Sequence, residues 1–333
     1  MSRRVRSAVL ALLLTATACG GTTESDSITV YVGRSEALVA PLIARFEVET
    51  GITVEARYAS STDLAATLRE EGANSPADVF FAQDPASLGA VAEAGMFRTL
   101  SAAITSLVPD RFSDSDGRWV GVSGRSRVVV YDTTRLAPSD LPDDIDGFTD
   151  PAWRGRIGIA PSNASFLAFV AAMIIDRGEE ATAAWLEGIA ANEPQLFSGN
   201  APIVAAIDDG TVEVGLVNHY YLLGLIADQG SSTAANHFFV TAGPESLVMP
   251  AGAGILTTSD SPTAAEQFIE FLLSEEAQNY FAAETFEYPL IAGLDAPAEL
   301  PPLESLAQPD LDLSALATVI DRATDLVAAA GLL

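Results

Sequence analysis

The sequence contains no lysine, only two histidines and a single cysteine. All 17 basic residues are therefore arginines, and 45 acidic residues outweigh them to give a net charge of −28. A chain this acidic repels nucleic acid and anionic lipid, so neither is an expected partner, whereas its field raises the local concentration of cations. The single cysteine excludes an internal disulfide bond.

Residue types that serve catalysis are also scarce. The two histidines, His219 and His237, are not spaced from one another as a metal-ligand pair. No Gly-x-Ser-x-Gly motif is present, and no glycine-rich phosphate loop follows a predicted strand. These absences favour a binding protein, and we expect that it is not an enzyme.

The amino terminus has the pattern of an export signal. Three arginines lie in the first six residues, residues 8–14 are apolar, and Ala16-Thr-Ala18 is a small-residue cleavage site before Cys19. This run resembles a bacterial lipobox, so residues 1–18 are predicted to be a signal peptide and Cys19 to carry the lipid. The alternative is an ordinary signal peptide followed by an unpaired thiol. Residues 19–27 are then a flexible tether, and the protein is expected to be extracytoplasmic, touching the cell membrane only through this anchor.

The whole chain has 333 residues, and what remains after this leader is long enough for two lobes of ordinary size. Residues 28–95 alternate strands with helices, which predicts a mainly parallel α/β sheet flanked by helices. Strands are expected at 28–31, 53–58 and 76–82, with helices between them and over 85–95.

Two strands, 119–124 and 127–132, are expected to cross between lobes around a polar corner at 123–126. A second α/β series follows, with strands at 156–160 and 212–217 and helices after 161–165, over 179–191 and over 200–209. Short strands at 237–240, 246–249 and 252–256 return toward the first lobe. Two helices over 262–283 break near Ser274, residues 289–309 are extended, and residues 313–330 form a closing helix.

The candidate site follows the strand at 212–217, where Asn218, His219, Tyr220 and Tyr221 precede a helix expected over 222–227. Ligands bind at the carboxyl ends of strands in such sheets. The two tyrosines are either core aromatics or ligands. A free phenol has a pKa near 10, but Fe³⁺ is a strong enough Lewis acid to deprotonate it. Two phenolates would cancel two of its three charges, leaving room for a carboxylate, a small anion or hydroxide.

Several motifs in a fixed order carry a family resemblance. They are Ile28-Thr-Val-Tyr31, Phe46-Glu-Val-Glu-Thr-Gly-Ile52, Pro76-Ala-Asp-Val-Phe80, the run from Trp119 to Tyr131, Asn218-His-Tyr-Tyr221 and Glu287-Tyr-Pro-Leu290. As a set they resemble the ferric-ion-binding proteins and lipoproteins of bacterial ABC iron importers. The resemblance implies a two-lobed class II periplasmic-binding-protein fold with a ligand cleft between the lobes. Lobe 1 would comprise residues 28–127 and 247–297, and lobe 2 residues 128–246 and 298–333.

The resemblance also implies the roles of individual residues. Metal ligands fall on Tyr220 and Tyr221, and anion contacts on Asn163, Ala164, Ser165, Asn200, Asn218 and Arg125. Two positions depart from the family pattern, because Ser35 stands where many members have histidine and Gln83 where they have glutamate. Both are weak ligands, so Glu36 or Asp84, solvent or an anion would complete the metal shell.

The resulting expectation is a monomeric solute-binding lipoprotein that carries Fe³⁺ to an ABC permease and its ATPase. The iron would be held with a synergistic anion (carbonate, phosphate or citrate) or as a small chelate. One alternative is an oxyanion or carboxylated small molecule as cargo in the same fold. The other is a surface lipoprotein that docks a protein and transports nothing.

Overall fold

The computed structural model describes residues 27–333. The predicted signal peptide, the lipidation site Cys19 and most of the predicted tether lie outside the described residues. Ser27, predicted as the end of the tether, opens the first strand, β1 (Ser27–Val32). None of the described helices is long and apolar enough to cross a membrane.

The first lobe is built on three parallel strands, β1, β2 (Thr53–Tyr58) and β3 (Val79–Ala82). The sheet continues in the order β2-β1-β3-β9-β4, where β9 is Val248–Ile255 and β4 is Val120–Asp132. The flanking helices are α1 (Glu36–Thr50), α2 (Ser61–Glu71), α3 (Pro85–Glu93) and the short α4 (Ala102–Thr105). Gly51 ends α1 in the left-handed conformation that glycine adopts without strain, as its position in the sequence predicts.

The second lobe contains β5 (Ile157–Ile159), β6 (Gln195–Leu196), β7 (Val214–Asn218) and β8 (Ala234–His237). Strand β7 is parallel to β5 and antiparallel to β4, so the sheet is mixed. Its helices are α5 (Ala164–Arg177), α6 (Glu179–Ala191), α7 (Asn200–Asp208) and α8 (Tyr220–Gln229). The strand predicted at 237–240 is wrong in position, because β8 ends at His237.

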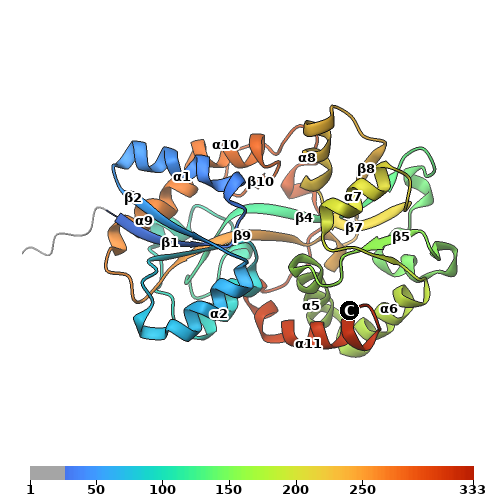
Figure 1. Cartoon of the computed structure of the whole chain (residues 1–333), viewed down its shortest axis with the longest axis horizontal. Helices are drawn as coiled ribbons and strands as arrows, with labels where there is room; N and C mark the ends of the chain where they lie inside the picture. The colour runs from blue at the N-terminus through green and yellow to red at the C-terminus, as the bar shows by residue number, and fades with distance from the viewer. Residues whose placement is uncertain (1–26) are drawn as a thin grey trace, which may run out of the picture.

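Both lobes share β4 (Val120–Asp132), one continuous strand of 13 residues. The predicted polar corner at 123–126 is therefore wrong. These polar residues are buried because the first half of β4 pairs with β9 and β10 while its second half pairs with β7 and β8. Figure 1 shows β4 and β9 running from one lobe into the other.

The second shared strand is β9 (Val248–Ile255), where two short strands were predicted on either side of Pro250. Pro250 lies opposite Gly124 of β4, but β3 pairs only with residues 252–255. A proline lacks an N–H donor and is tolerated where no further strand needs one.

The carboxyl-terminal part contains α9 (Pro262–Leu272), α10 (Glu275–Glu284), β10 (Tyr288–Pro289) and α11 (Leu316–Ala329). Ser274 caps α10 by accepting from the Ala277 N–H, so the break predicted there is confirmed. Helix α11 packs against α3 of the first lobe and against α5 of the second, along the lower side in Figure 1.

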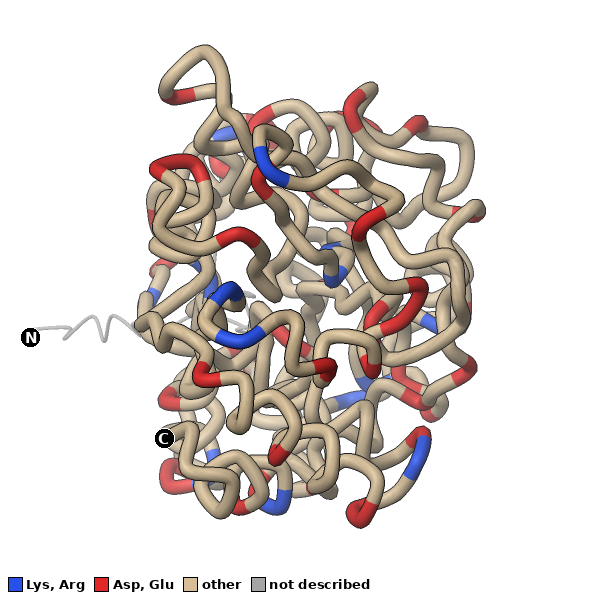
Figure 2. The backbone as a smooth tube through the Cα atoms, turned by 90° about the vertical axis from the view of Figure 1, so that its right-hand side faces the viewer, with Lys and Arg blue, Asp and Glu red and all other residues tan. Residues whose placement is uncertain are grey.

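The mixed α/β architecture in two lobes is the fold class predicted from the sequence. Its hydrophobic core comprises two clusters of buried residues, the smaller lying among β4, β7 and α7 of the second lobe. Acidic positions occupy loops and helices all around the side shown in Figure 2, with the arginine positions scattered among them.

Candidate metal and anion site

Tyr220 and Tyr221 open α8, directly after the carboxyl end of β7. The helix therefore begins two residues earlier than predicted. Their rings are stacked with centroids 4.3 Å apart and planes 27° apart, and both side chains are half-buried. Burial, and next the charge of Tyr221, raises the pKa of Tyr220 well above its ordinary value. Without a cation Tyr220 is held as a neutral phenol.

His219 is a structural residue, and both of its ring nitrogens are occupied. Nδ1 accepts a hydrogen bond from the Ser126 N–H at 3.0 Å, and Nε2 lies 2.7 Å from the Phe286 carbonyl oxygen, to which it donates. Burial lowers the pKa of His219 to about 4. The neutral ring thus ties the tyrosine-bearing turn to β4 and to the segment before β10.

Arg127 was missed by sequence reasoning, although it lies beside the tyrosines. Its side chain is 3% exposed, and Nη1 donates to Ser165 Oγ at 3.2 Å and to Asn218 Oδ1 at 3.0 Å. Burial lowers the pKa of Arg127 to about 10, while Tyr221 and Tyr220 act in the opposite direction. The sequence contained a signal for Arg127. It stands two residues after the predicted contact Arg125, and alternate residues of a strand lie on the same face.

The predicted anion contacts other than Arg125 are gathered around Arg127. Asn163 Oδ1 accepts from the Ser165 N–H at 3.0 Å, from Ser165 Oγ at 2.6 Å and from Asn200 Nδ2 at 3.2 Å. Ala164 begins α5 and Asn200 begins α7, so two helix amino termini meet here. Within residues 27–333, Arg127 Nη2 and Asn218 Nδ2 are buried without a hydrogen-bond partner. Unpaired buried donors at helix amino termini suit a small anion.

Arg125, which was predicted to lie near the anion, is placed beside a buried carboxylate. Its Nε is buried 3.8 Å from the Glu287 carboxylate, too far for a hydrogen bond, and this carboxylate accepts from Arg34 at 2.9 Å and from Ser123 at 2.8 Å. Burial opposes ionisation of Glu287, but Arg34 and Arg125 hold its pKa below its usual range. Arg125 therefore lies in the ion-pair network where β4 crosses the lobes. Its positive charge also opposes the burial that raises the pKa of Tyr220.

The predicted first-lobe ligands lie at the carboxyl edge of β1 and β3. Ser35 and Glu36 are exposed at the start of α1, and Gln83 is half-buried. Asp84 caps α3, accepting from the Ser87 N–H at 2.8 Å and the Ser87 hydroxyl at 3.0 Å, so its carboxylate is already used. No group of three or more His, Cys, Asp or Glu side chains in the described part of the chain is placed to hold a metal ion.

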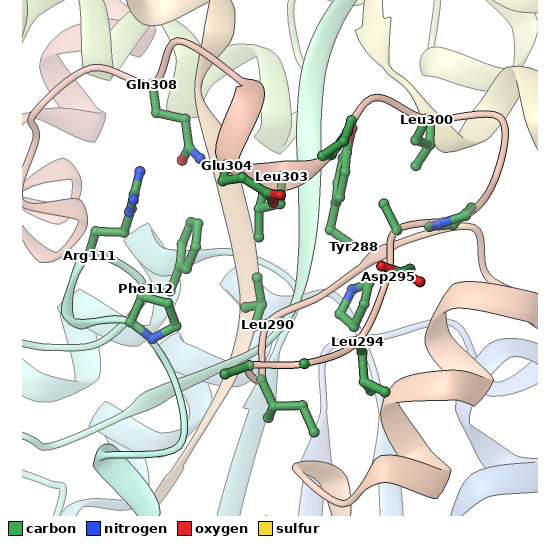
Figure 3. A pocket seen from close by; sticks show the side chains of 18 of the residues that line it. Arg111, Phe112, Tyr288, Leu290, Leu294, Asp295, Leu300, Leu303, Glu304 and Gln308 are labelled. Atoms are coloured by element: carbon green, nitrogen blue, oxygen red, sulfur yellow. The ribbon is translucent and has the colours of Figure 1, made fainter.

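A separate pocket of about 450 Å³ lies behind the crossing strands, between residues 109–112 and 288–308 (Figure 3). Leu290, Leu300 and Leu303 line it together with Arg111 and Glu304. None of the predicted site residues lines this pocket, so it is distinct from the tyrosine site.

The family profile of bacterial extracellular solute-binding proteins matches residues 74–311. The chain belongs to this family. The Fe(3+)-binding periplasmic protein of Serratia marcescens is 32% identical over 311 residues, which cover 92% of this chain and 91% of that protein. The major ferric iron-binding protein of Neisseria meningitidis serogroup B is 32% identical over the whole of both chains.

Solved structures of the family have the same fold. Iron-bound HitA from Pseudomonas aeruginosa superposes with a TM-score of 0.87 at 33% identity, covering 92% of this chain and 99% of that one. A Trichodesmium protein in complex with iron and citrate superposes with a TM-score of 0.81 at 27% identity, covering 92% and 100%. The resemblance inferred from the sequence motifs is confirmed, and this solute-binding protein has the two-lobed fold of ferric-binding relatives.

Proposed function

We propose that this solute-binding protein captures Fe³⁺ through Tyr220 and Tyr221, together with a small anion. The stacked tyrosine pair beside the buried Arg127 is the observation that carries the proposal. Relatives that cover nearly the whole chain are named as ferric-iron-binding proteins, which supports the same cargo here.

The chemistry follows from the charges at the site. Fe³⁺ displaces the phenol proton that burial otherwise retains on Tyr220, because a strong Lewis acid lowers the pKa of its ligands. The cost of an ionised phenol in this half-buried place is offset by the cation and by the nearby charges of Arg127 and Arg125. The Tyr220 phenolate thus forms only when the metal is bound.

The anion would lie against Arg127, Asn218 and the start of α5. Arg127 Nη2 and Asn218 Nδ2 supply free donors, and Ser165 and Asn200 supply polar groups beside them. Carbonate, phosphate and citrate each present oxygens that could accept from these donors and bind the metal together. A related structure contains citrate with iron, which makes citrate one reasonable choice.

Capture would proceed by closure of the lobes about β4 and β9, the hinge mode of two-lobed binding proteins. The moving parts would be residues 28–127 with 247–297, and residues 128–246 with 298–333. Anchoring through Cys19 and delivery to an ABC permease and its ATPase complete the proposed role, with the protein acting as a monomer and without catalysis.

The test is a titration of the purified protein with ferric citrate, followed by visible absorbance. Iron phenolates absorb visible light by charge transfer, so the parent protein is expected to colour with one iron per chain. Tyr221→Phe is expected to lose about half of the absorbance per bound iron, because only the Tyr220 phenolate remains, and to bind iron at least about tenfold more weakly. Tyr131→Phe, a core tyrosine of β4, is the control. Binding of equal strength and colour in Tyr221→Phe would exclude the proposed metal site.

The second candidate keeps the fold and takes an oxyanion or a carboxylated small molecule as its only cargo. The unpaired donors of Arg127 and Asn218 favour it, as do the neutral side chains of Ser35 and Gln83. In that case phosphate or citrate alone would raise the thermal midpoint as much as it does with iron, and no colour would develop.

A further inference from the structure

The pocket behind the crossing strands has one wall that the sheet holds in place. Tyr288 and Leu290 line it and are 0% and 2% exposed. Tyr288 pairs with Gly124 of β4, and the Leu290 N–H donates to Gln278 Oε1 at 2.8 Å. The Tyr288 hydroxyl already donates to the Pro301 carbonyl oxygen at 3.1 Å. This wall is therefore preformed and presents apolar surface to the pocket.

The size of the pocket and the rest of its apolar lining suit a small molecule. Its volume of about 450 Å³ lies within the range of small-molecule sites, and Phe112, Leu300 and Leu303 extend the apolar surface. A branched aliphatic group placed among these side chains would be removed from water, which favours binding.

The charged side chains of the pocket have no partner of their own. Arg111, Asp295 and Glu304 line it and are exposed. Within residues 27–333, none of these three side chains forms a hydrogen bond or an ion pair. The only contact of this kind is that of the Arg111 guanidinium carbon, 5.7 Å from the centroid of the Phe112 ring. Free charges of both signs thus stand beside an apolar wall.

The charges are arranged in a way that selects among ligands. In Figure 3, Arg111, Gln308 and Glu304 follow one another along one side of the pocket, and Asp295 lies on the other side. The ammonium and the carboxylate of an α-amino acid are separated by a single carbon atom, so their partners must lie on the same side. Arginine binds a carboxylate through two parallel hydrogen bonds, and a glutamate accepts from an ammonium.

We propose that this pocket binds a free α-amino acid with an apolar side chain, such as leucine. Arg111 takes the carboxylate and Glu304 the ammonium, while the aliphatic side chain packs against Leu290 and Leu303. An apolar acid without the ammonium is repelled by Glu304, and an apolar amine gains nothing from Arg111. The site uses none of the residues proposed to hold Fe³⁺ or its anion, so it is a second site that does not require iron.

The first experiment is an NMR titration of the iron-free protein with L-leucine, followed by saturation transfer to the ligand. The Kd is expected near about 1 mM, as is common for so small a ligand. Isocaproate lacks the ammonium and isoamylamine lacks the carboxylate, and each is expected to bind at least about fivefold more weakly. Isocaproate or isoamylamine binding as tightly as leucine would overturn the proposal, as would no binding of leucine up to about 20 mM.

The second experiment assigns each charge to its partner. Arg111→Gln is expected to weaken leucine at least about fivefold without weakening isoamylamine, and Glu304→Gln to weaken leucine as much without weakening isocaproate. Arg69→Gln and Glu299→Gln are the controls, because both residues are exposed, neither forms an ion pair among the described residues, and neither lines this pocket. The controls should change leucine binding less than about twofold. Equal losses in the variants and their controls would overturn the assignment.

A third measurement separates this pocket from the tyrosine site. Tyr221→Phe is expected to bind leucine as the parent does, and ferric citrate should not displace leucine from the parent. Loss of leucine binding in Tyr221→Phe, with parental binding in Arg111→Gln, would place leucine at the tyrosine site and overturn the proposal. The iron titration is read by colour in the absence of leucine, so failure of either proposal leaves the other standing.

Discussion

At the scale of single residues, the site combines groups that are unfavourable without a ligand. Arg127 is fully buried with one guanidinium nitrogen unpaired, and burial lowers its pKa to about 10. Tyr220 retains its proton for the same reason. A buried cation with an unpaired donor is poorly compensated in the unliganded protein, and the proposed anion, bound with the ferric ion, would supply the missing partner.

Replacing Arg127 should therefore separate binding from stability. Arg127→Met is expected to weaken anion-supported iron binding at least about tenfold, because a charged donor to the anion is lost. The thermal midpoint without ligand should fall by no more than about 4 °C, since losing two hydrogen bonds is offset by removing a desolvated charge. Calorimetry and iron titration check both quantities, with the exposed Arg45→Met as control. A much larger fall in midpoint would show that Arg127 is chiefly structural.

From the sequence, Arg125 was named as an anion contact and Arg127 was not. The choice depended on a corner at 123–126, whereas β4 continues through it. In a continuous strand the two arginines share a face, and position along the strand decides which one reaches Ser165 and which one Glu287. That position depends on the pairing of β4 with strands far away in sequence, so local pattern could not supply it.

At the scale of elements, the crossing strands are joined by a buried ionic network. Glu287 precedes β10, Arg125 and Ser123 lie on β4, and Arg34 follows β1. One carboxylate thus connects the loop that leads to Glu36 with the strand shared by both lobes. Local sequence shows none of these contacts, because they join residues more than 160 positions apart.

Removing the Glu287 charge should destabilise the protein in a pH-dependent way. Glu287→Gln is expected to lower the free energy of unfolding by about 3 kcal/mol or more at pH 7, because two buried arginines lose their counter-charge. The folded pKa of Glu287 lies below its ordinary value, so this stabilisation is present above that ordinary value and is lost as pH falls through the folded pKa. The difference between parent and variant should therefore shrink below about pH 4.

Denaturant unfolding at several pH values checks this expectation. Glu276→Gln is the matched control, because Glu276 forms an exposed pair with Arg45 that should contribute less than about 1 kcal/mol. A pH-independent difference between parent and Glu287→Gln would contradict the role of the ionised carboxylate.

At the scale of the whole molecule, the local α/β pattern was enough to predict the two lobes. The spacing of apolar residues and capping residues such as Ser274 indicate each strand–helix unit. The local pattern could not show that β4 and β9 each run unbroken through both lobes. The polar residues of β4 between 123 and 127 are buried by parts of the chain that are distant in sequence, so their burial could not be predicted from local pattern.

Two lobes joined by shared strands should respond as a unit to iron. Iron with an anion is expected to reduce the radius of gyration and, at one hundred times Kd, to stabilise the fold by about 2.7 kcal/mol. X-ray scattering and thermal unfolding measure the two effects, and at the same iron concentration Tyr221→Phe should show a smaller stabilisation. Stabilisation with no change in the radius of gyration would argue against closure.

Helix α11 lies across the boundary between the lobes, packed against α3 and α5, on the side of the molecule opposite α8 in Figure 1. Gly89 of α3 packs so closely against the turn that leads into α11 that a Cβ atom would collide with the Ser314 carbonyl oxygen. Pivoting of the lobes must change the packing of α11 against α3 or against α5. Because no cysteine occurs among residues 27–333, an environment-sensitive dye on a cysteine introduced at the exposed Asp321 would turn the protein into an optical iron sensor whose reporter lies far from its binding site.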